Sequence, residues 1–566
     1  MKQEIKQYNR DIEKHFDVKY SASNEVRRDV RVRYSLALSQ QDLSLSDLRA
    51  LSYNYFYSRT QMLGQPGKFI LTVDDRDTSK GNHLQPMLDK LRWLGIEWDE
   101  GPDSLFQHQN PTKEGPFNYR VSQRKELYNK MAHSLLENKD AYQCFCTHDR
   151  LKEMGQYDRK CYSMGQSEVN QRMADGEPYQ VRLYTPRKGK TDWMDIVQGS
   201  VSMPNSDLDD TILINYDGTP TQAMIDLVDD FYLKISHVIR NQTHMKSTVQ
   251  QLLMCKMLEL DPPSFAHLPN LVQPNTQVSL KKEPTLSQLI DKGFFPEALL
   301  NGIALLGWNP PHREDPAVVS APLNVFMKSE MLLVKDIVTL FNLDKVQKQG
   351  VTYMYENMVL LNQLHLRQRF TYYDTLEQKR CVQQFRKMFQ ESVSGSANQQ
   401  KVRLMNEAKM RKVMELLKDK IRFPSDLNSH LYFIQDPDPL INDHEKLAIH
   451  KVLRRLKLRE GDTPQSVLAE VKQRLSKIAD DQFNAQQINK VCSMVLYERA
   501  RAKREVRNED MFNLIRAAVS ATEGMVSSPP IGEVCEIVGK QGVIKRIEDF
   551  IKYTEGLGKE GAKAKA

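Results

Sequence analysis

Three of the chain's seven cysteines lie close together, and their thiols could bind a metal ion. Cys144 and Cys146 form a Cys-x-Cys pair, and Cys161 follows within a short segment. Thiolates are suitable ligands for tetrahedral Zn²⁺, and the phenol of Tyr157 or the imidazole of His148 could complete the set. The segment is therefore a candidate for a structural zinc site. The alternative is a group of ordinary reduced cysteines, because Cys-x-Cys is less typical of zinc than Cys-x-x-Cys.

The composition limits the class of protein. Seven cysteines are too few and too scattered for a disulfide framework, which indicates a reducing compartment. A chain of 566 residues is too long for one hydrophobic core, so we expect about three or four domains. No apolar run approaches the roughly 20 residues of a membrane helix, so we expect no membrane span. The net charge of +7 permits contact with nucleic acid through local patches but does not require it.

Strand and helix patterns alternate after a polar N-terminal extension, residues 1–29. Residues 30–137 read as strand, helix, strand and helix, and residues 211–322 resume this rhythm. Parallel strands joined by helical crossovers form an α/β sheet. Residues 138–210 break the pattern with cysteine, glycine and charged residues. We interpret them as an α+β insertion between two halves of one parallel sheet.

The C-terminal part of the chain follows a helical pattern. Beyond about residue 322, strand patterns largely vanish and apolar residues recur at i, i+3, i+4 and i+7. We predict one helical subdomain over 323–465 and a second over 466–555. Residues 556–566 are predicted to form a basic flexible tail.

Two segments carry a family resemblance. Residues 66–100, PGKFILTVDDRDTSKGNHLQPMLDKLRWLGIEWDE, and 217–240, DGTPTQAMIDLVDDFYLKISHVIR, resemble the discriminating (bacterial and organellar) glutamyl-tRNA synthetases. Co-linear segments extend the resemblance from about residue 30 to 553. It implies a Rossmann-like sheet of the class I synthetase type, followed by an all-α bundle of the anticodon-binding type. It also places the cysteines in an acceptor-stem-type insertion, where some family members have a structural zinc knuckle.

The positions that would bind ATP differ from the family's first signature, PSPTGxLHIGxAR. Counting back from Arg49, which matches the closing arginine, no histidine or glycine is found at the corresponding positions. The last of these positions is Asp47, whose carboxylate would be electrostatically unfavourable beside phosphates unless a metal is present. The alternative is an ordinary capped helix start, with serine as the N-cap. The four positions are Ser44, Leu45, Ser46 and Asp47.

The family's second signature, KLSKR, is also incomplete. It corresponds to residues 278–282, VSLKK, and retains only Lys281 and Lys282. A lysine pair of this kind could equally be solvated surface. Because several lost charge partners act on one transition state, we expect negligible catalysis and no ATP or magnesium in the site.

The amino-acid site departs from the family pattern as well. The glutamate of RIEDTD is shortened to Asp74, and the aromatic and amide positions of TPTYxxxNVVDD fall on Gln222 and Asp226. Arg33 and Arg240 match the arginines expected near glutamate. These arginines could equally hold an aspartate in a structural ion pair. We interpret the combined changes as relaxed constraint on the sequence of the site, rather than as a change in amino-acid specificity.

Basic residues form two groups that could contact RNA phosphates. The resemblance to a tRNA-binding bundle favours this interpretation, and a solvated charged face is the alternative. The candidates are Arg150, Lys152, Arg159 and Lys160 in the insertion, and Arg499, Arg501, Lys503, Arg504 and Arg507 on a late helix.

Three functions follow from these observations. We predict a catalytically inactive glutamyl-tRNA synthetase-like protein, reused as a structural subunit that binds RNA (tRNA or ribosomal RNA) or protein subunits. The resemblance to organellar enzymes suggests an assembly such as a mitochondrial ribosome, and hence the mitochondrial matrix, although no presequence is evident. One alternative is a divergent but active glutamate–tRNA ligase. Another is a protein-only scaffold subunit of another mitochondrial complex.

Overall fold

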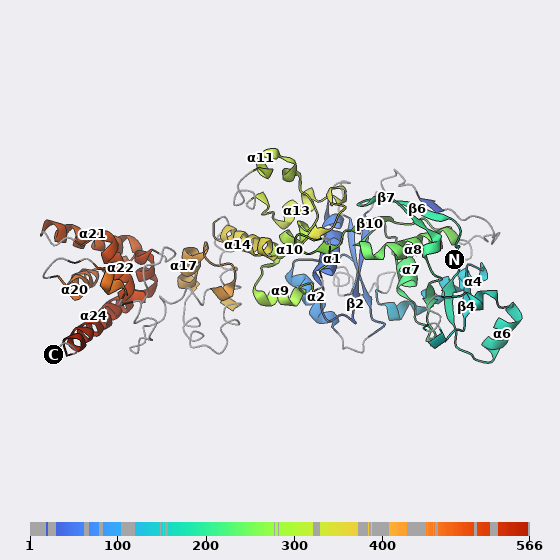
Figure 1. Cartoon of the computed structure of the whole chain (residues 1–566), viewed down its shortest axis with the longest axis horizontal. Coiled ribbons are helices and arrows are strands. Elements are labelled where there is room, and N and C mark those ends of the chain that lie inside the picture. The colour runs from blue at the N-terminus through green and yellow to red at the C-terminus, as the bar shows by residue number, and fades with distance from the viewer. Residues whose placement is uncertain are drawn as a thin grey trace. The chain divides into compact units, whose positions relative to one another are not determined.

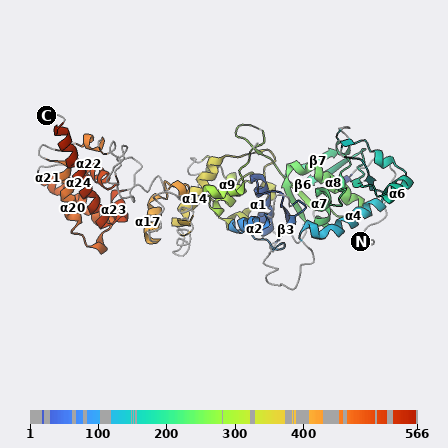
Figure 2. The ribbon, with the colours of Figure 1, turned by 90° about the horizontal axis from the view of Figure 1, so that it is seen from below.

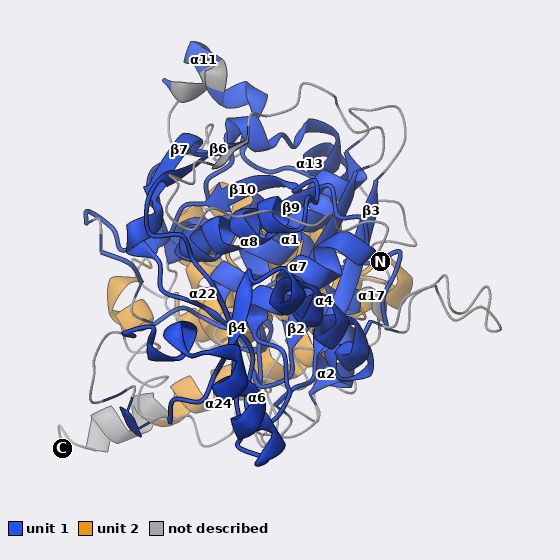
Figure 3. Ribbon diagram, turned by 90° about the vertical axis from the view of Figure 1, so that its right-hand side faces the viewer, with its two compact units in different colours: residues 1–361 blue, residues 362–566 orange. Residues whose placement is uncertain are grey.

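The computed structural model forms two compact units, residues 1–361 and 362–566 (Figure 3). None of the helices in the described part of the chain is long and apolar enough to cross a membrane. The described residues are 18–20, 30–60, 67–77, 83–102, 119–147, 149–150, 152, 157–276, 278–280, 282–320, 329–371, 383, 386–387, 407–426, 449, 451–456, 458, 462–502, 506–520 and 530–563.

The first unit is built on a seven-stranded sheet in the order β1-β6-β10-β9-β2-β3, with β7 beside β6. Every neighbouring pair is parallel except β6 and β7. This confirms the predicted parallel sheet. The strands are β1 (Val18–Tyr20), β2 (Arg31–Ala37), β3 (Lys68–Asp74), β6 (Lys190–Asp195), β7 (Gly199–Pro204), β9 (His237–Asn241) and β10 (Ser264–Leu268).

Apolar sequence explains the burial of β3, the last strand in the order of this sheet. β3 has the sequence KFILTVD, and its five interior residues are all buried. A continuous apolar strand of this kind is typical of a parallel sheet covered on both faces. The short parallel pair β11 (Leu271–Val272) and β12 (Val351–Thr352) lies outside the main sheet.

Helices follow the strands as the sequence pattern predicts. Helix α1 contacts β2, β3 and β9, and α7 packs against α4 and α8, as Figures 1 and 2 show. The helices are α1 (Leu45–Arg59), α2 (Leu84–Trp93), α4 (Lys125–Glu137), α6 (Gln166–Ala174), α7 (Gln222–Tyr232), α8 (Met245–Met257), α9 (Leu286–Lys292), α10 (Pro296–Ala304), α11 (Pro316–Val319), α13 (Val334–Leu340) and α14 (Tyr355–Thr371).

The predicted insertion, residues 138–210, contains strands of two different sheets. β4 (Ala141–Cys144) and β5 (Gln180–Leu183) form a small antiparallel sheet with β8 (Ile212–Ile214). β6 and β7 also fall within the range but belong to the main sheet. β8 lies in residues 211–322, which we predicted to continue the main sheet, but it pairs with β5 in the small sheet instead. Its short apolar run cannot by itself reveal which strand it pairs with.

The described residues of the second unit form helices joined by turns and loops, without a strand among them. This confirms the predicted all-α C-terminal part. Its long helix α24 packs against α20, α22 and α23. The helices are α17 (Glu407–Leu417), α20 (Pro464–Leu475), α21 (Ala485–Arg501), α22 (Asn508–Ser520), α23 (Ile531–Val538) and α24 (Lys540–Lys563).

Candidate active site

The candidate site lies where the strand order of the main sheet reverses. The chain runs from β2 through α1 to β3 on one side, and from β9 through α8 to β10 on the other. β2 and β9 are neighbours, so they mark a topological switch point. In open α/β sheets, ligands bind beyond the carboxyl ends of the strands at this point. The ends of β2 and β9 and the start of α1 are therefore the first place to look for chemistry.

A serine cap begins α1. The Oγ of Ser44 accepts a hydrogen bond from the backbone N–H of Asp47 at 3.1 Å and donates one to the Asp47 carboxylate at 2.8 Å. Ser44 is thus an N-cap, and Asp47 lies in the first turn, where a negative charge is favourable. The capped-start alternative describes these residues correctly. Arg49 is buried and donates to the backbone carbonyls of Pro269 and Leu306.

A carboxylate from a distant part of the chain lies on the start of α1. The Glu283 side chain accepts hydrogen bonds from the backbone N–H of Ser46 at 2.7 Å and from its hydroxyl at 2.6 Å. Glu283 directly follows the lysine pair of the second signature. Lys282 is exposed, and Lys281 lies outside the described residues. The fold therefore brings the two candidate ATP-binding segments together, with an anionic side chain at the helix N-terminus.

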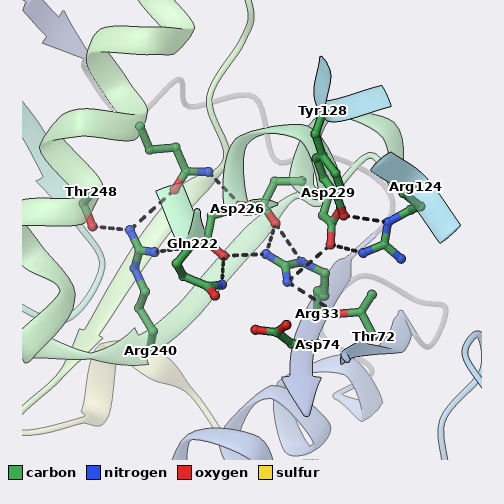
Figure 4. Close-up of polar contacts among 12 residues, drawn as sticks. Arg33, Thr72, Asp74, Arg124, Tyr128, Gln222, Asp226, Asp229, Arg240 and Thr248 are labelled. Atoms are coloured by element: carbon green, nitrogen blue, oxygen red, sulfur yellow. Dashed lines mark hydrogen bonds and ion pairs between the residues drawn. The ribbon is translucent and has the colours of Figure 1, made fainter. Parts of the chain in front are cut away.

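Arg33 lies on β2 among three aspartates of α7 (Figure 4). Its guanidinium is 3.2 Å from Asp226, 2.9 Å from Asp230 and 3.9 Å from Asp229. Burial opposes the charge on Arg33, but the aspartates outweigh this effect and raise the pKa of the guanidinium above its usual value. The arginine is therefore held as a cation.

Arg240, near the end of β9, reaches the same group of residues from the other side. One guanidinium nitrogen lies 3.3 Å from the Asp226 carboxylate, and another donates to the hydroxyl of Thr248 at 2.6 Å. Burial lowers the pKa of Arg240. Asp226 thus contacts both arginines that the family resemblance places near glutamate. The structural ion pair with Asp226 that the sequence left open is present.

Asp74 pairs with Arg76, two residues further along the chain. The Arg76 guanidinium lies 2.6 Å from the Asp74 carboxylate and donates to Gln222 at 3.0 Å. Gln222 in turn donates to Asp226 at 2.9 Å. Side-chain contacts therefore link all the predicted residues of the amino-acid site. Gln222 connects the Asp74–Arg76 pair to Asp226, which contacts the two arginines.

Residues that the sequence interpretation missed hold the aspartates Asp229 and Asp230 in place. Asp229 is fully buried, pairs with Arg124 at 2.5 Å and accepts a hydrogen bond from Tyr128 at 2.9 Å. Asp230 accepts one from Gln251 at 2.7 Å. Consecutive aspartates in the otherwise apolar helix sequence MIDLVDDFY were the available signal, because buried carboxylates require partners.

A second buried network joins Arg240 to β6. Thr248 contacts the Nε2 atom of His267 at 2.7 Å, and the Nδ1 atom of His267 lies 2.5 Å from the Asp195 carboxylate. Burial lowers the pKa of His267. A neutral imidazole can donate from Nδ1 to Asp195 and accept from Thr248 at Nε2. This network fixes Thr248 beside the Arg240 guanidinium.

The three predicted metal-binding cysteines converge. Their sulfur atoms all lie within 4.8 Å of one another, and those of Cys146 and Cys161 are 3.4 Å apart. The phenol of Tyr157 donates to the Cys144 sulfur at 3.3 Å, while His148 lies outside the described residues. Sulfurs bound to one zinc ion at about 2.3 Å would have similar separations. The donor set therefore fits the metal, although buried thiols in an aromatic cluster can also make these contacts.

Several candidate RNA-binding residues are engaged in internal ion pairs. Arg159 binds Asp210 and the carbonyl of Thr185, and Arg150 pairs with Asp158. Arg499 is buried.

The buried Arg499 is paired with Glu470 and Asp462, and Arg507 pairs with Asp510. Arg159 and Arg499 therefore do not contribute to a free basic surface, which corrects the prediction for these two. The sequence could not show that Arg499 faces inward from α21. Lys152, Lys160 and Arg501 are exposed, whereas Lys503 and Arg504 lie outside the described residues.

The chain matches two protein families. Residues 30–347 match the catalytic domain of the class I tRNA synthetases (E and Q), and residues 380–551 match an anticodon binding domain.

Similar proteins cover nearly the whole chain. "Glutamate--tRNA ligase 2" of Caldicellulosiruptor saccharolyticus is 28% identical over 540 residues, which is 92% of this chain and 98% of the relative. "Glutamate--tRNA ligase" of Bacillus licheniformis is 26% identical over 542 residues, covering 93% and 99%. A crystal structure of a glutamate tRNA ligase from Elizabethkingia meningosepticum with its amino acid has a TM-score of 0.73 at 22% identity, and covers 93% of this chain and 99% of that one. This last likeness shows the fold.

Proposed function

The chain belongs to the family of class I tRNA synthetases for glutamate and glutamine, and we propose that it is a glutamate–tRNA ligase. The observation that carries this proposal is the extent of the match. The similarity runs through both the catalytic and the anticodon-binding families, and the glutamate–tRNA ligases that the chain resembles are covered almost end to end.

The prediction of a catalytically inactive structural subunit was wrong. Relatives named glutamate–tRNA ligase match more than nine-tenths of this chain, which favours an active ligase. The sequence argument gave too much weight to individual signature side chains. Backbone N–H groups and the helix dipole at the start of α1 do not depend on a histidine, and they are the parts of a helix that bind phosphate.

The proposed reaction has two steps. The glutamate α-carboxylate attacks the α-phosphate of ATP and releases pyrophosphate, and the resulting glutamyl group passes from AMP to tRNA. In this proposal the start of α1 and Lys282 face the phosphates, and Arg33 and Arg240 supply positive charge to glutamate. Magnesium would neutralise the phosphates when it is bound. The helical second unit would bind tRNA, with exposed Arg501 as a candidate phosphate contact.

Charging of tRNA tests the function. Purified full-length protein should attach labelled glutamate to glutamate-specific tRNA in the presence of ATP and magnesium. Lys282→Ala should reduce the rate by about tenfold or more, because a charge partner of the phosphates is lost. Lys256→Ala, which removes an exposed lysine of α8, is the matched control and should charge tRNA normally. Absence of charging across tRNA preparations would reject the proposal.

We also propose a structural zinc ion bound by Cys144, Cys146 and Cys161, with Tyr157 as the fourth ligand. The bound ion would hold the three thiolates together and cross-link β4 to the segment around residue 161. Cys161→Ser should lower both the zinc content, measured by plasma emission spectrometry, and the thermal unfolding temperature. Cys255→Ser, at a buried cysteine outside this group, is the control and should retain the metal. A wild-type protein purified without chelator that contains no zinc would contradict this proposal.

The discriminating character and the mitochondrial matrix location are further parts of the proposal, supported by the resemblance of residues 66–100 and 217–240. A discriminating enzyme should charge glutamate-specific tRNA and leave glutamine-specific tRNA uncharged. Cell fractionation of the tagged natural protein tests the location.

A further inference from the structure

One carboxylate joins the two arginines of the candidate amino-acid site. The Oδ1 atom of Asp226 lies 3.2 Å from a guanidinium nitrogen of Arg33, and its Oδ2 atom lies 3.3 Å from one of Arg240. Figure 4 shows the carboxylate between the two guanidinium groups. Each carboxylate oxygen thus accepts a hydrogen bond from a different arginine, as the carboxylate of a bound anionic ligand would.

The other two aspartates near Arg33 have a different character. Asp229 and Asp230 have side-chain exposures of 0% and 3%, and each has a further buried partner. Asp226 is 14% exposed, and its additional contact is with the exposed Gln222. Asp229 and Asp230 therefore stabilise the charge of Arg33 from the protein interior, whereas Asp226 lies at the edge that a ligand could reach.

We propose that Asp226 is a specificity-determining residue, which competes with the carboxylate of the amino-acid substrate for Arg33 and Arg240. This inference rests on the proposed function. An incoming carboxylate must either displace Asp226 or bind beside a like charge where little solvent screens the repulsion. The protein therefore binds glutamate more weakly than its two arginines alone would allow. Glutamate has a side-chain carboxylate that glutamine lacks, so Asp226 weakens the binding of glutamate more than that of glutamine.

The substitution Asp226→Asn removes the charge with almost no change in shape. The amide oxygen can still accept a hydrogen bond, so the fold should be retained, but it competes less well for a guanidinium than a carboxylate does. We expect the Kd for glutamate to fall by about tenfold, as befits the loss of a charged hydrogen-bond competitor. The Kd for glutamine, whose side chain is neutral, should fall less. Glutamate-dependent ATP–pyrophosphate exchange should show a lower KM with little change in kcat.

Isothermal titration calorimetry of the full-length protein with glutamate and with glutamine measures these changes directly. Asp207→Asn is the matched control, because it removes an exposed carboxylate without an ion pair among the described residues. Its affinities should equal those of the wild type. Asp226→Ser, which removes the same charge with a smaller side chain, should shift the glutamate affinity in the same direction and provides a second test if the asparagine variant does not fold.

Three outcomes would overturn the inference in different ways. Equal glutamate affinity in wild type and Asp226→Asn, with exchange activity present in the wild type, rejects the role of Asp226 and leaves the ligase function standing. Failure of both proteins to bind glutamate rejects the inference together with the proposed function. An equal gain in affinity for glutamate and glutamine rejects the role in specificity.

Discussion

Asp226 and Glu283 each place a carboxylate where the proposed ligase would receive an anionic part of a substrate. Asp226 lies on the two arginines, and Glu283 accepts two hydrogen bonds at the start of α1. Both side chains retain partial access to solvent. These internal contacts satisfy the site's charges, so substrates must exchange with the two carboxylates.

Removal of the Glu283 charge should therefore favour ATP binding. Glu283→Gln keeps the side-chain length, but its neutral amide accepts more weakly from Ser46 and no longer repels phosphate. We expect the KM for ATP in pyrophosphate exchange to fall by about threefold to tenfold. Glu356→Gln, at an exposed position of α14, should leave the KM unchanged. An increase in KM for Glu283→Gln would show instead that the carboxylate organises the ATP site.

Burial of His267 should make the first unit less stable in weak acid. Burial lowers the pKa of His267 from its ordinary value of 6.5, so the unfolded chain binds a proton at a higher pH than the folded protein does. The stabilising contribution is therefore complete above pH 6.5 and is lost as the pH falls toward the lowered pKa. Burial opposes the charge on Asp195, but the hydrogen bond to His267 outweighs this effect and lowers the pKa of the carboxyl group. Its stabilising contribution is therefore also lost as the pH falls, at a lower pH than that of His267.

Urea unfolding followed by tryptophan fluorescence measures this effect, because the chain's four tryptophans all lie within residues 93–308. Between about pH 7.5 and about pH 5.5 the free energy of unfolding should decrease less in His267→Asn than in the wild type. Substitution of the exposed His133 by asparagine should leave the pH dependence unchanged. An identical slope in His267→Asn and wild type would contradict the assignment.

Sequence reasoning grouped residues that the structure places together, but it did not identify all of their partners. It identified Arg33, Arg240 and Asp226, and it recognised that an ion pair among them was one alternative. The contact between Glu283 and Ser46 joins positions that are 237 residues apart, and no local pattern encodes it. Such contacts depend on how the loop after β11 folds back onto α1.

At the scale of elements, apolar periodicity predicted the strands and helices with strong patterns. β2, β3, β9 and α8 lie within residues 30–137 and 211–322, where we predicted alternating strands and helices. β6 and β7, with the sequences KTDWMD and GSVSMP, are rich in polar residues and lack a comparable signal. Their place in the main sheet is decided by pairing with distant strands, which sequence pattern cannot reveal.

The N-cap of α1 should contribute measurable stability. Ser44→Ala removes the acceptor for the backbone N–H of Asp47, and we expect the free energy of unfolding of the first unit to fall by about 1 kcal/mol. Ser44→Asn restores an acceptor and should recover most of this loss. Urea unfolding by tryptophan fluorescence is again the measurement, and an unchanged midpoint for Ser44→Ala would show that the cap is unimportant.

At the scale of the whole molecule, the length of the match identifies the family. Family similarity extends through residues 30–347 and 380–551, in both units. Within the first unit, the topological switch point brings together the start of α1, the end of β9 and two arginines held as part of a charged network. These features are what a ligase needs to position ATP and an anionic amino acid.

Glutamate-dependent ATP–pyrophosphate exchange by the purified full-length protein is the most direct test of the proposed activity. The assay, run with glutamate-specific tRNA present, reports formation of glutamyl-adenylate without requiring transfer of the glutamyl group to the tRNA. We predict exchange that depends on glutamate and is abolished or strongly reduced in Arg240→Ala, while Asp207→Asn retains it. A folded wild-type protein that shows no exchange at saturating glutamate, ATP and magnesium would contradict the account.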